Sequence, residues 1–203
     1  MVLVMHQFGD VAEAAVTWPH NAAGSQDFVG VTEPAPESGN REEAYFGRYV
    51  ALDAECQKRT VGMPIAYLDN DAVHFRRKVP LAPALGEACI GVVRTVNPLI
   101  PYNCGALYLR AGDEARRFLA RILFHKDECL KIRDGHADEH AFARAMLDMP
   151  GAVAVLDPAW NNWLKATGER LRPAVVQAFH AMKGASRLAA VQASVALSVE
   201  KDL

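Results

Sequence analysis

The sequence predicts an α/β protein with a mainly parallel central sheet flanked by helices. Short apolar runs alternate with segments of helical periodicity through the first two-thirds of the chain, which is typical of this class. One run, Pro64–Leu68, is apolar throughout, as expected of a strand that is buried on both faces. With 203 residues, 51% of them hydrophobic, the chain is long enough for one sizeable core, so we expect a single domain.

The first 35 or so residues predict two strands with a helix between them. The strands are the apolar residues 2–5 and 28–32. The helix opens at Asp10, where Glu13 completes a capping signal, and it ends before Pro19.

A second capping signal, Asn40 with Glu43, opens a longer helix. Apolar side chains then recur at spacings of 4, 3 and 4 residues. This spacing predicts one buried face of a single helix of about five turns. The residues of that face are Tyr45, Tyr49, Leu52 and Cys56.

The remainder of the chain continues the alternation of strands and helices. Asp113 opens a helix, and a terminal helix follows Gly184. The apolar face of the first of these helices comprises Ala115, Phe118, Leu119 and Ile122. We expect strands at residues 89–94, 104–110, 152–156 and 174–179, and a further helix at 137–147.

Composition and charge exclude several classes of protein. A formal net charge of −2 gives no overall basic field for nucleic acid and no acidic excess typical of a disordered tail. The four cysteines show no close pairing, so we expect buried free thiols in a reducing compartment. The first eight residues lack the basic region of a signal peptide, and no apolar stretch has the length of a membrane span. We therefore expect a cytoplasmic protein.

Two acidic residues, Asp69 and Asp71, follow the apolar run Pro64–Leu68 directly. Ligands of α/β proteins bind beyond the carboxyl ends of the strands, so this position favours a binding site. Carboxylate oxygens suit Mg²⁺ or Mn²⁺, which usually take one or two carboxylates together with phosphate and water. Because an isolated Asp-x-Asp is more often part of a turn or a helix cap, the motifs that follow it decide the interpretation.

Five sequence blocks follow one another between about residues 41 and 187. They are PIAYLDNDAVHFRRKVPL, IGVVRTVNPLIPYNCGALYLRAGDEARRFLARIL, DEHAFARAML, LDPAWNNW and AFHAMKGASR. In this order they resemble five segments of one family. The first block resembles its Asp-x-Asp strand, and the second resembles its Asn-x-Gly strand with the helix behind it. The last three resemble the acidic pair of a later helix, the Trp-Asn loop and the closing His/Lys/Gly/Arg segment. That family is the nucleotide-diphospho-sugar transferases of the GT-A fold, particularly its small bacterial and viral members.

The resemblance implies a metal-bound nucleotide diphosphate. Asp71 would ligate Mn²⁺ or Mg²⁺ directly, and Asp69 would contact the metal or the ribose of the nucleotide. His180 would complete the metal site. Lys183 and Arg187 would hold the diphosphate.

The resemblance also implies roles toward the sugar. Asn103 and Gly105 would line the donor-sugar pocket, and Asp138 would touch the sugar or the acceptor and serve as base if the reaction inverts configuration. The donor would be a UDP- or GDP-sugar and the acceptor is open. A single GT-A-like domain would span residues 1–203, with a nucleotide-binding half at 1–71, a donor-sugar and acceptor half at 72–187, and a C-terminal helix at 188–203.

Three other interpretations remain open at this point. The segment HADEH, residues 136–140, fits the H-x-x-E-H pattern of inverted zinc proteases, because two histidines four residues apart share a helix face. A strand followed by Asp-x-Asp also occurs in phosphohydrolases that form an aspartyl-phosphate, which would make Asp69 a nucleophile. The short half before Asp69 is compatible with a non-catalytic binding protein that has a degenerate transferase fold.

Overall fold

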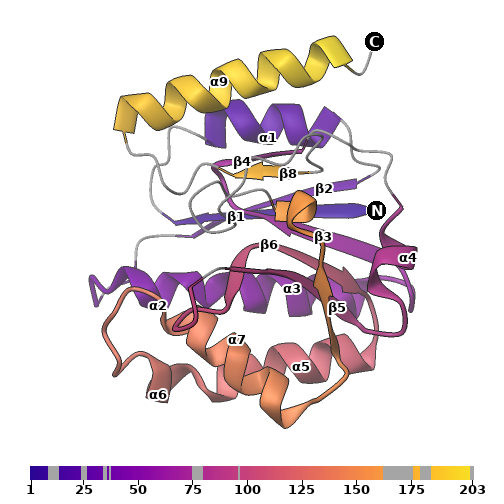
Figure 1. Cartoon of the computed structure of the whole chain (residues 1–203), viewed down its shortest axis with the longest axis vertical. Coiled ribbons are helices and arrows are strands. Elements are labelled where there is room, and N and C mark those ends of the chain that lie inside the picture. Colours follow the sequence, from indigo (N-terminus) through magenta and orange to yellow (C-terminus); the bar gives the residue numbers. More distant parts are fainter. Residues whose placement is uncertain are drawn as a thin grey trace.

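Six strands form one sheet through the middle of the computed structural model, in the order β2-β1-β3-β6-β5-β7 (Figure 1). Strand β6 runs antiparallel to its neighbours β3 and β5, and the other neighbouring pairs are parallel. The predicted α/β class with a mainly parallel sheet is therefore confirmed. The strands are β1 (Val2–Phe8), β2 (Asp27–Glu33), β3 (Pro64–Leu68), β5 (Ile90–Arg94), β6 (Tyr102–Arg110) and β7 (Val153–Leu156).

The structure describes residues 1–8, 14–23, 27–33, 36, 38–74, 80–95, 97–161, 176–178 and 184–201. Among these residues, no helix has the length and apolar character that crossing a membrane requires.

Helices cover both faces of the sheet, so successive residues of an inner strand are buried on opposite sides. In β1, Val2 and Val4 belong to one core cluster, whereas Leu3 and Met5 belong to a second. Figure 1 shows α3, α5 and α7 on one side of the sheet and α1 and α9 on the other. The helices of the first side are α2 (Arg41–Tyr45), α3 (Gly47–Lys58), α5 (Asp113–Phe124), α6 (Lys126–Cys129) and α7 (Ala137–Asp148). The face predicted for the helix that begins at Asp113, now α5, is confirmed, since its buried residues are Ala115, Phe118, Leu119 and Ile122.

The single long helix predicted after Asn40 is wrong, because the chain forms two helices, α2 and α3, separated by a turn. Asn40 does cap α2, since its side chain accepts a hydrogen bond from the N–H of Glu42 (3.0 Å). The interruption falls at Phe46, directly before Gly47, the first residue of α3. A Cβ at Gly47 would lie 2.7 Å from the Glu33 carboxylate and 2.8 Å from the His6 ring, so any larger residue would displace these side chains of β1 and β2. Glycine also weakens a helix, which explains why the helical pattern breaks at this point.

The predicted end of the first helix before Pro19 is also wrong. Helix α1 (Ala14–Ala23) continues through Pro19, although proline removes one backbone hydrogen bond from a helix. The side chains of Thr17, Trp18 and Asn21 donate hydrogen bonds to the chain segment that follows β3. These tertiary contacts on both sides of Pro19 stabilise a helix that the local sequence would end.

A small second sheet lies on the same side of the main sheet as α1 and α9 (Figure 1). It pairs β4 (Ala72–His74) antiparallel with β8 (Val176–Ala178), and α9 (Gly184–Lys201) contacts both β4 and α1. The strand predicted at 174–179 therefore exists over its described residues, but outside the central sheet. Two short helices, α4 (Leu81–Leu85) and the 3₁₀ helix η1 (Pro158–Asn161), complete the described structure.

Candidate functional site

Asp69 and Asp71 come directly after β3, where this strand ends beside the start of the antiparallel strand β6. The Asp69 N–H donates a hydrogen bond to the Gly105 carbonyl (2.8 Å), which ties the end of β3 to the start of β6. The Tyr67 hydroxyl donates to Asp69 Oδ1 (2.7 Å). Burial raises the pKa of Tyr67 well above its ordinary value, so the phenol keeps its proton and remains a donor. The prediction that residues 64–68 form an interior strand ending in these acids is confirmed.

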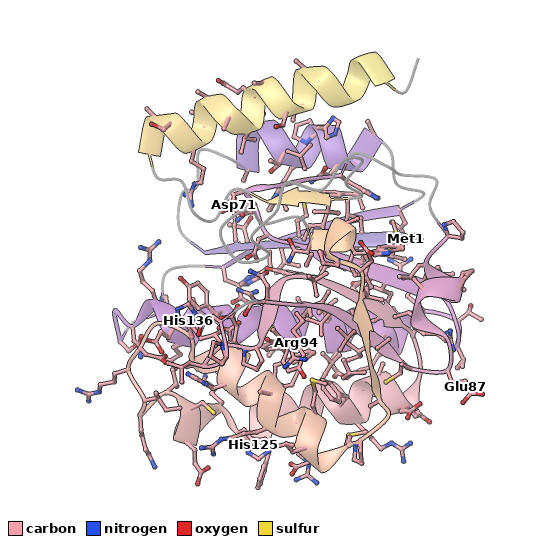
Figure 2. The ribbon with its side chains drawn as sticks, in the orientation of Figure 1. Met1, Asp71, Glu87, Arg94, His125 and His136 are labelled. Atoms are coloured by element: carbon pink, nitrogen blue, oxygen red, sulfur yellow. The ribbon has the colours of Figure 1, made fainter. Side chains whose placement is uncertain are left out.

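Residues 69–72 form a turn with Asn70 and Asp71 at its two central positions. The Ala72 N–H donates to the Asp69 carbonyl (3.0 Å), which closes the turn. The Asn70 amide contacts α1 and β1, because Asn70 Oδ1 accepts from Trp18 Nε1 (2.7 Å) and Asn70 Nδ2 donates to the His6 carbonyl (3.2 Å). Asp71 is buried, with 7% of its surface exposed, and its Oδ2 lies 3.4 Å from Arg187 Nη1 of α9. Figure 2 shows Asp71 on the side of the main sheet that carries α1 and α9.

A buried arginine joins two of the predicted acids. Arg48, from α3, places its Nη1 atom 3.5 Å from Asp69 Oδ1 and 3.8 Å from Asp138 Oδ2, and the same atom donates to the Cys104 carbonyl (2.8 Å). Its guanidinium also lies over the Tyr45 ring (5.5 Å) and the Tyr67 ring (5.3 Å). Sequence reasoning missed this residue. The available signal was that residue 48 falls among residues 45, 49, 52 and 56 on the apolar face of the helix, where a charge needs a buried partner.

Asp138 lies in the first turn of α7 and only 4% of it is exposed. Burial raises its pKa to about 6, although the positive charge of Arg48 acts in the opposite direction. The Tyr49 hydroxyl lies 3.5 Å from Asp138 Oδ2. A carboxyl group that titrates near pH 6 can gain or lose a proton near neutral pH, which suits acid–base chemistry.

Asn103 is held in a fixed orientation at the start of β6. Its Oδ1 accepts hydrogen bonds from the Gly105 N–H (2.9 Å) and from Asn161 Nδ2 (2.7 Å) of η1. The predicted pair Asn103 and Gly105 is thus linked directly, and Asn161 joins it. The motif LDPAWNNW resembles the Trp-Asn loop of the transferase family, but nothing in the sequence connects Asn161 with Asn103. Neighbouring Trp160 has a packing role, because its ring meets the Tyr108 ring edge to face at 5.0 Å in the core.

The histidines of the H-x-x-E-H segment contact different carboxylates. His136 Nδ1 lies 2.8 Å from Glu139 Oε2, and His140 Nε2 lies 2.7 Å from Asp134 Oδ2. The hydrogen bond with Glu139 raises the pKa of His136. Over the described part of the chain, no group of three or more His, Cys, Asp or Glu side chains is placed to hold a metal ion. The zinc-protease interpretation, whose two histidines lie wholly within that part, therefore has no structural support.

The chemistry of the two acids of the turn suits a divalent cation that a ligand helps to bind. Their hard carboxylate oxygens match Mg²⁺ and Mn²⁺, which need only one or two protein carboxylates when phosphate and water supply the other positions. The side chain of Asp69 is 24% exposed, so it is accessible from outside. The predicted third ligand His180, like Lys183, lies outside the described residues.

The fold is shared with solved glycosyltransferases. A glycosyltransferase involved in the glycosylation of the major capsid of PBCV-1 matches with a TM-score of 0.74, covering 95% of this chain and 98% of that chain at 14% identity. Mouse xyloside xylosyltransferase 1 matches with a TM-score of 0.54, covering 88% of this chain and 97% of that chain at 14% identity. The galactosyltransferase LgtC matches with a TM-score of 0.52, covering 96% of each chain at 13% identity.

The chain has a GT-A-like glycosyltransferase fold. No family model matches its sequence, and no curated protein is significantly similar to it. The GT-A-like fold is therefore established by structure, and it extends over nearly the whole chain, as the predicted single domain requires. Within it, the predicted residues Asp69, Asn103, Gly105 and Asp138 come together at one edge of the sheet, and Asp71 meets Arg187 beside them.

Proposed function

We propose that this protein transfers a sugar from a nucleotide-diphosphate donor, UDP- or GDP-linked, to an acceptor. The observation that carries the proposal is the turn Asp69-Asn70-Asp71 at the carboxyl end of an interior strand, joined through Arg48 to the buried acid Asp138. The glycosyltransferases that share the fold support the same reaction class.

In this proposal Asp69 and Asp71 hold Mn²⁺ or Mg²⁺, with His180 as a third ligand. The bound cation would neutralise negative charge on the departing nucleoside diphosphate. Lys183 and Arg187 would bind the diphosphate as fixed cations. Arg187 already lies beside Asp71, so it is close enough to the metal ligands to serve there.

The sugar would lie against Asn103, Gly105 and Asp138. The hydrogen bonds of Asn103 to Gly105 and Asn161 hold its side chain in place before any ligand binds, which favours precise orientation of a sugar hydroxyl. Asp138, with a pKa of about 6, is mostly ionised at neutral pH and could accept a proton from an acceptor hydroxyl. The shared glycosyltransferase fold favours sugar transfer over a phosphohydrolase role for Asp69.

Titration with UDP and with GDP, each with and without Mn²⁺, tests the proposal by calorimetry and by thermal shift. We expect one nucleotide to bind and to raise the melting temperature only when Mn²⁺ is present. Asp71→Asn keeps the shape of the side chain but removes its charge, so it should abolish the Mn²⁺-dependent part of binding. Asp127→Asn, an exposed acid on α6, is the matched control and should bind as the wild type does.

Two results would count against the proposal in different ways. Metal-dependent affinity that is unchanged in Asp71→Asn would show that Asp71 is not a ligand. Absence of binding to both nucleotides in the wild type would instead favour the non-catalytic interpretation of the fold.

A further inference from the structure

Helix α1 makes a series of hydrogen bonds to the turn that carries the acidic pair. Trp18 Nε1 donates to Asn70 Oδ1 (2.7 Å), and Thr17 Oγ1 donates to the Asn70 carbonyl (2.8 Å). One turn further along the helix, Asn21 Nδ2 donates to the Ala72 carbonyl (3.0 Å). The same helix therefore holds the middle of the turn and the residue that ends it.

These contacts hold Asn70, the residue that lies between the two acids. Asn70 uses both ends of its amide toward the protein interior, accepting from Trp18 and donating to the His6 carbonyl of β1 (3.2 Å). Hydrogen bonds at both ends of the Asn70 amide restrict movement of the turn at this residue. Asp69 and Asp71 flank this fixed residue, so their carboxylates are limited to the orientations that the turn allows.

The position of the indole is itself fixed by β2. A Cβ on Gly30 would lie 2.6 Å from Trp18 Cζ3, so the ring packs directly on the backbone of β2 where glycine leaves room. The Phe28 ring meets the indole edge to face, with 5.9 Å between ring centroids. Gly30 thus allows the indole N–H to reach Asn70.

We propose that Trp18 is a positioning residue for the divalent-cation site, acting through Asn70 on Asp69 and Asp71. The assignment rests on the proposed function, because it concerns the cation that the two acids would hold. Mg²⁺ and Mn²⁺ demand closely defined ligand positions. Residues that orient metal ligands without touching the metal typically contribute about 10–100-fold to metal affinity.

The test is titration of the full chain with Mn²⁺, alone and in the presence of a fixed concentration of UDP or GDP, following the electron paramagnetic resonance signal of free Mn²⁺. Trp18→Phe keeps an aromatic ring on Gly30 but removes the N–H donor, so we expect Mn²⁺ affinity to fall about 10-fold. Tyr108→Phe is the matched control. It deletes another buried donor, the hydroxyl that binds the Trp160 carbonyl (2.6 Å), on the same face of the sheet but away from the turn. Its Mn²⁺ affinity should equal that of the wild type.

Gly30→Ala provides a second variant that leaves Trp18 and Asn70 chemically intact. The added methyl group displaces the indole, so we expect Mn²⁺ affinity to fall as it does in Trp18→Phe. Circular dichroism and the melting temperature without metal verify that each variant is folded, and Gly30→Ala decides the outcome if Trp18→Phe does not fold.

Mn²⁺ affinity within about twofold of the wild type in a folded Trp18→Phe or Gly30→Ala protein would overturn the positioning role while leaving the proposed function in place. A wild-type protein that binds no Mn²⁺, alone or with a nucleotide, would overturn the metal-dependent function and this assignment together. An equal loss of affinity in Tyr108→Phe would show a general effect of stability, and would also overturn the assignment.

Discussion

At the scale of single residues, Arg48 links two acids of the candidate site. Its side chain is 8% exposed and faces the carboxylates of Asp69 and Asp138, so one buried cation compensates two acids. A buried charge without a partner is far more costly than one that is paired and hydrogen-bonded. The arrangement therefore makes the fold depend on the same charges that the proposed reaction uses.

We predict that Arg48→Met lowers the free energy of unfolding by about 3–5 kcal/mol at pH 7, because it leaves two acids without their shared partner. Urea denaturation measures the change. The double variant Arg48→Met/Asp138→Asn should recover part of the loss, since one uncompensated acid is then neutral. A loss below about 1 kcal/mol in the single variant would show that the charges are solvated rather than buried.

The raised pKa of Asp138 predicts that the stability of the fold depends on pH. This pKa is about 6 in the folded protein, against about 3.9 in an unfolded chain. Because folding raises this pKa, the protonated form stabilises the fold. That contribution is fully present below about pH 4 and is lost as the pH rises through about 6, amounting to about 3 kcal/mol. Asp138→Asn should remove this pH dependence. Urea denaturation of the wild type and the variant from pH 4 to pH 7 should give similar free energies of unfolding at pH 4, which diverge as the pH rises. Parallel profiles would contradict the raised pKa.

At the scale of elements, the two errors of sequence reasoning have one cause. The helical pattern is interrupted directly before Gly47, where the Glu33 and His6 side chains of the neighbouring strands approach closely. Helix α1 passes through Pro19 because its side chains hydrogen-bond the turn after β3. In both cases a contact with a distant element outweighs the local helical signal. The break before α3 and the continuation of α1 are thus set by tertiary contacts.

Helix α9 contributes an ion pair to the site, and we predict that it is energetically coupled. Asp71 and Arg187 have side chains that are 9% and 30% exposed, so solvent screens their attraction only in part. A double-mutant cycle of Asp71→Asn and Arg187→Gln, measured by denaturation in the presence of a chelator, should give a coupling of about 1 kcal/mol. Additive effects of the two substitutions would show that the contact contributes nothing to stability.

At the scale of the whole molecule, the core on the α3, α5 and α7 side of the sheet encloses all four cysteines as free, buried thiols. Burial raises the pKa of Cys56 to about 11 and that of Cys89 to about 12, so little thiolate is present at neutral pH. We predict that none of the four thiols reacts rapidly with Ellman's reagent in the native protein, and that all four react in denaturant. Rapid reaction of a native thiol would indicate that this core opens.

Much of the architecture and part of the candidate site followed from sequence. Strand and helix positions followed from local periodicity, as the buried face of α5 illustrates. Asp69 was singled out because it directly follows an apolar strand, where α/β folds form their binding sites. Asn103 and Asp138 were proposed only on motifs that resemble those of the transferase family. The roles proposed for Asp71, Gly105 and Arg187 rest on the same motifs.

The sequence by itself determined the α/β class, the strand that ends in the acidic pair and the motifs that resemble the transferase family, because these depend on neighbours along the chain. Only the tertiary structure decided the partners of those motifs. Trp18 lies 52 residues from Asn70, Arg48 lies 56 residues from Cys104, and Asn103 lies 58 residues from Asn161. Each pair meets only after separate elements pack on the sheet, and a buried polar group must then bond to whichever partner that packing brings near. Local sequence patterns do not specify such partners.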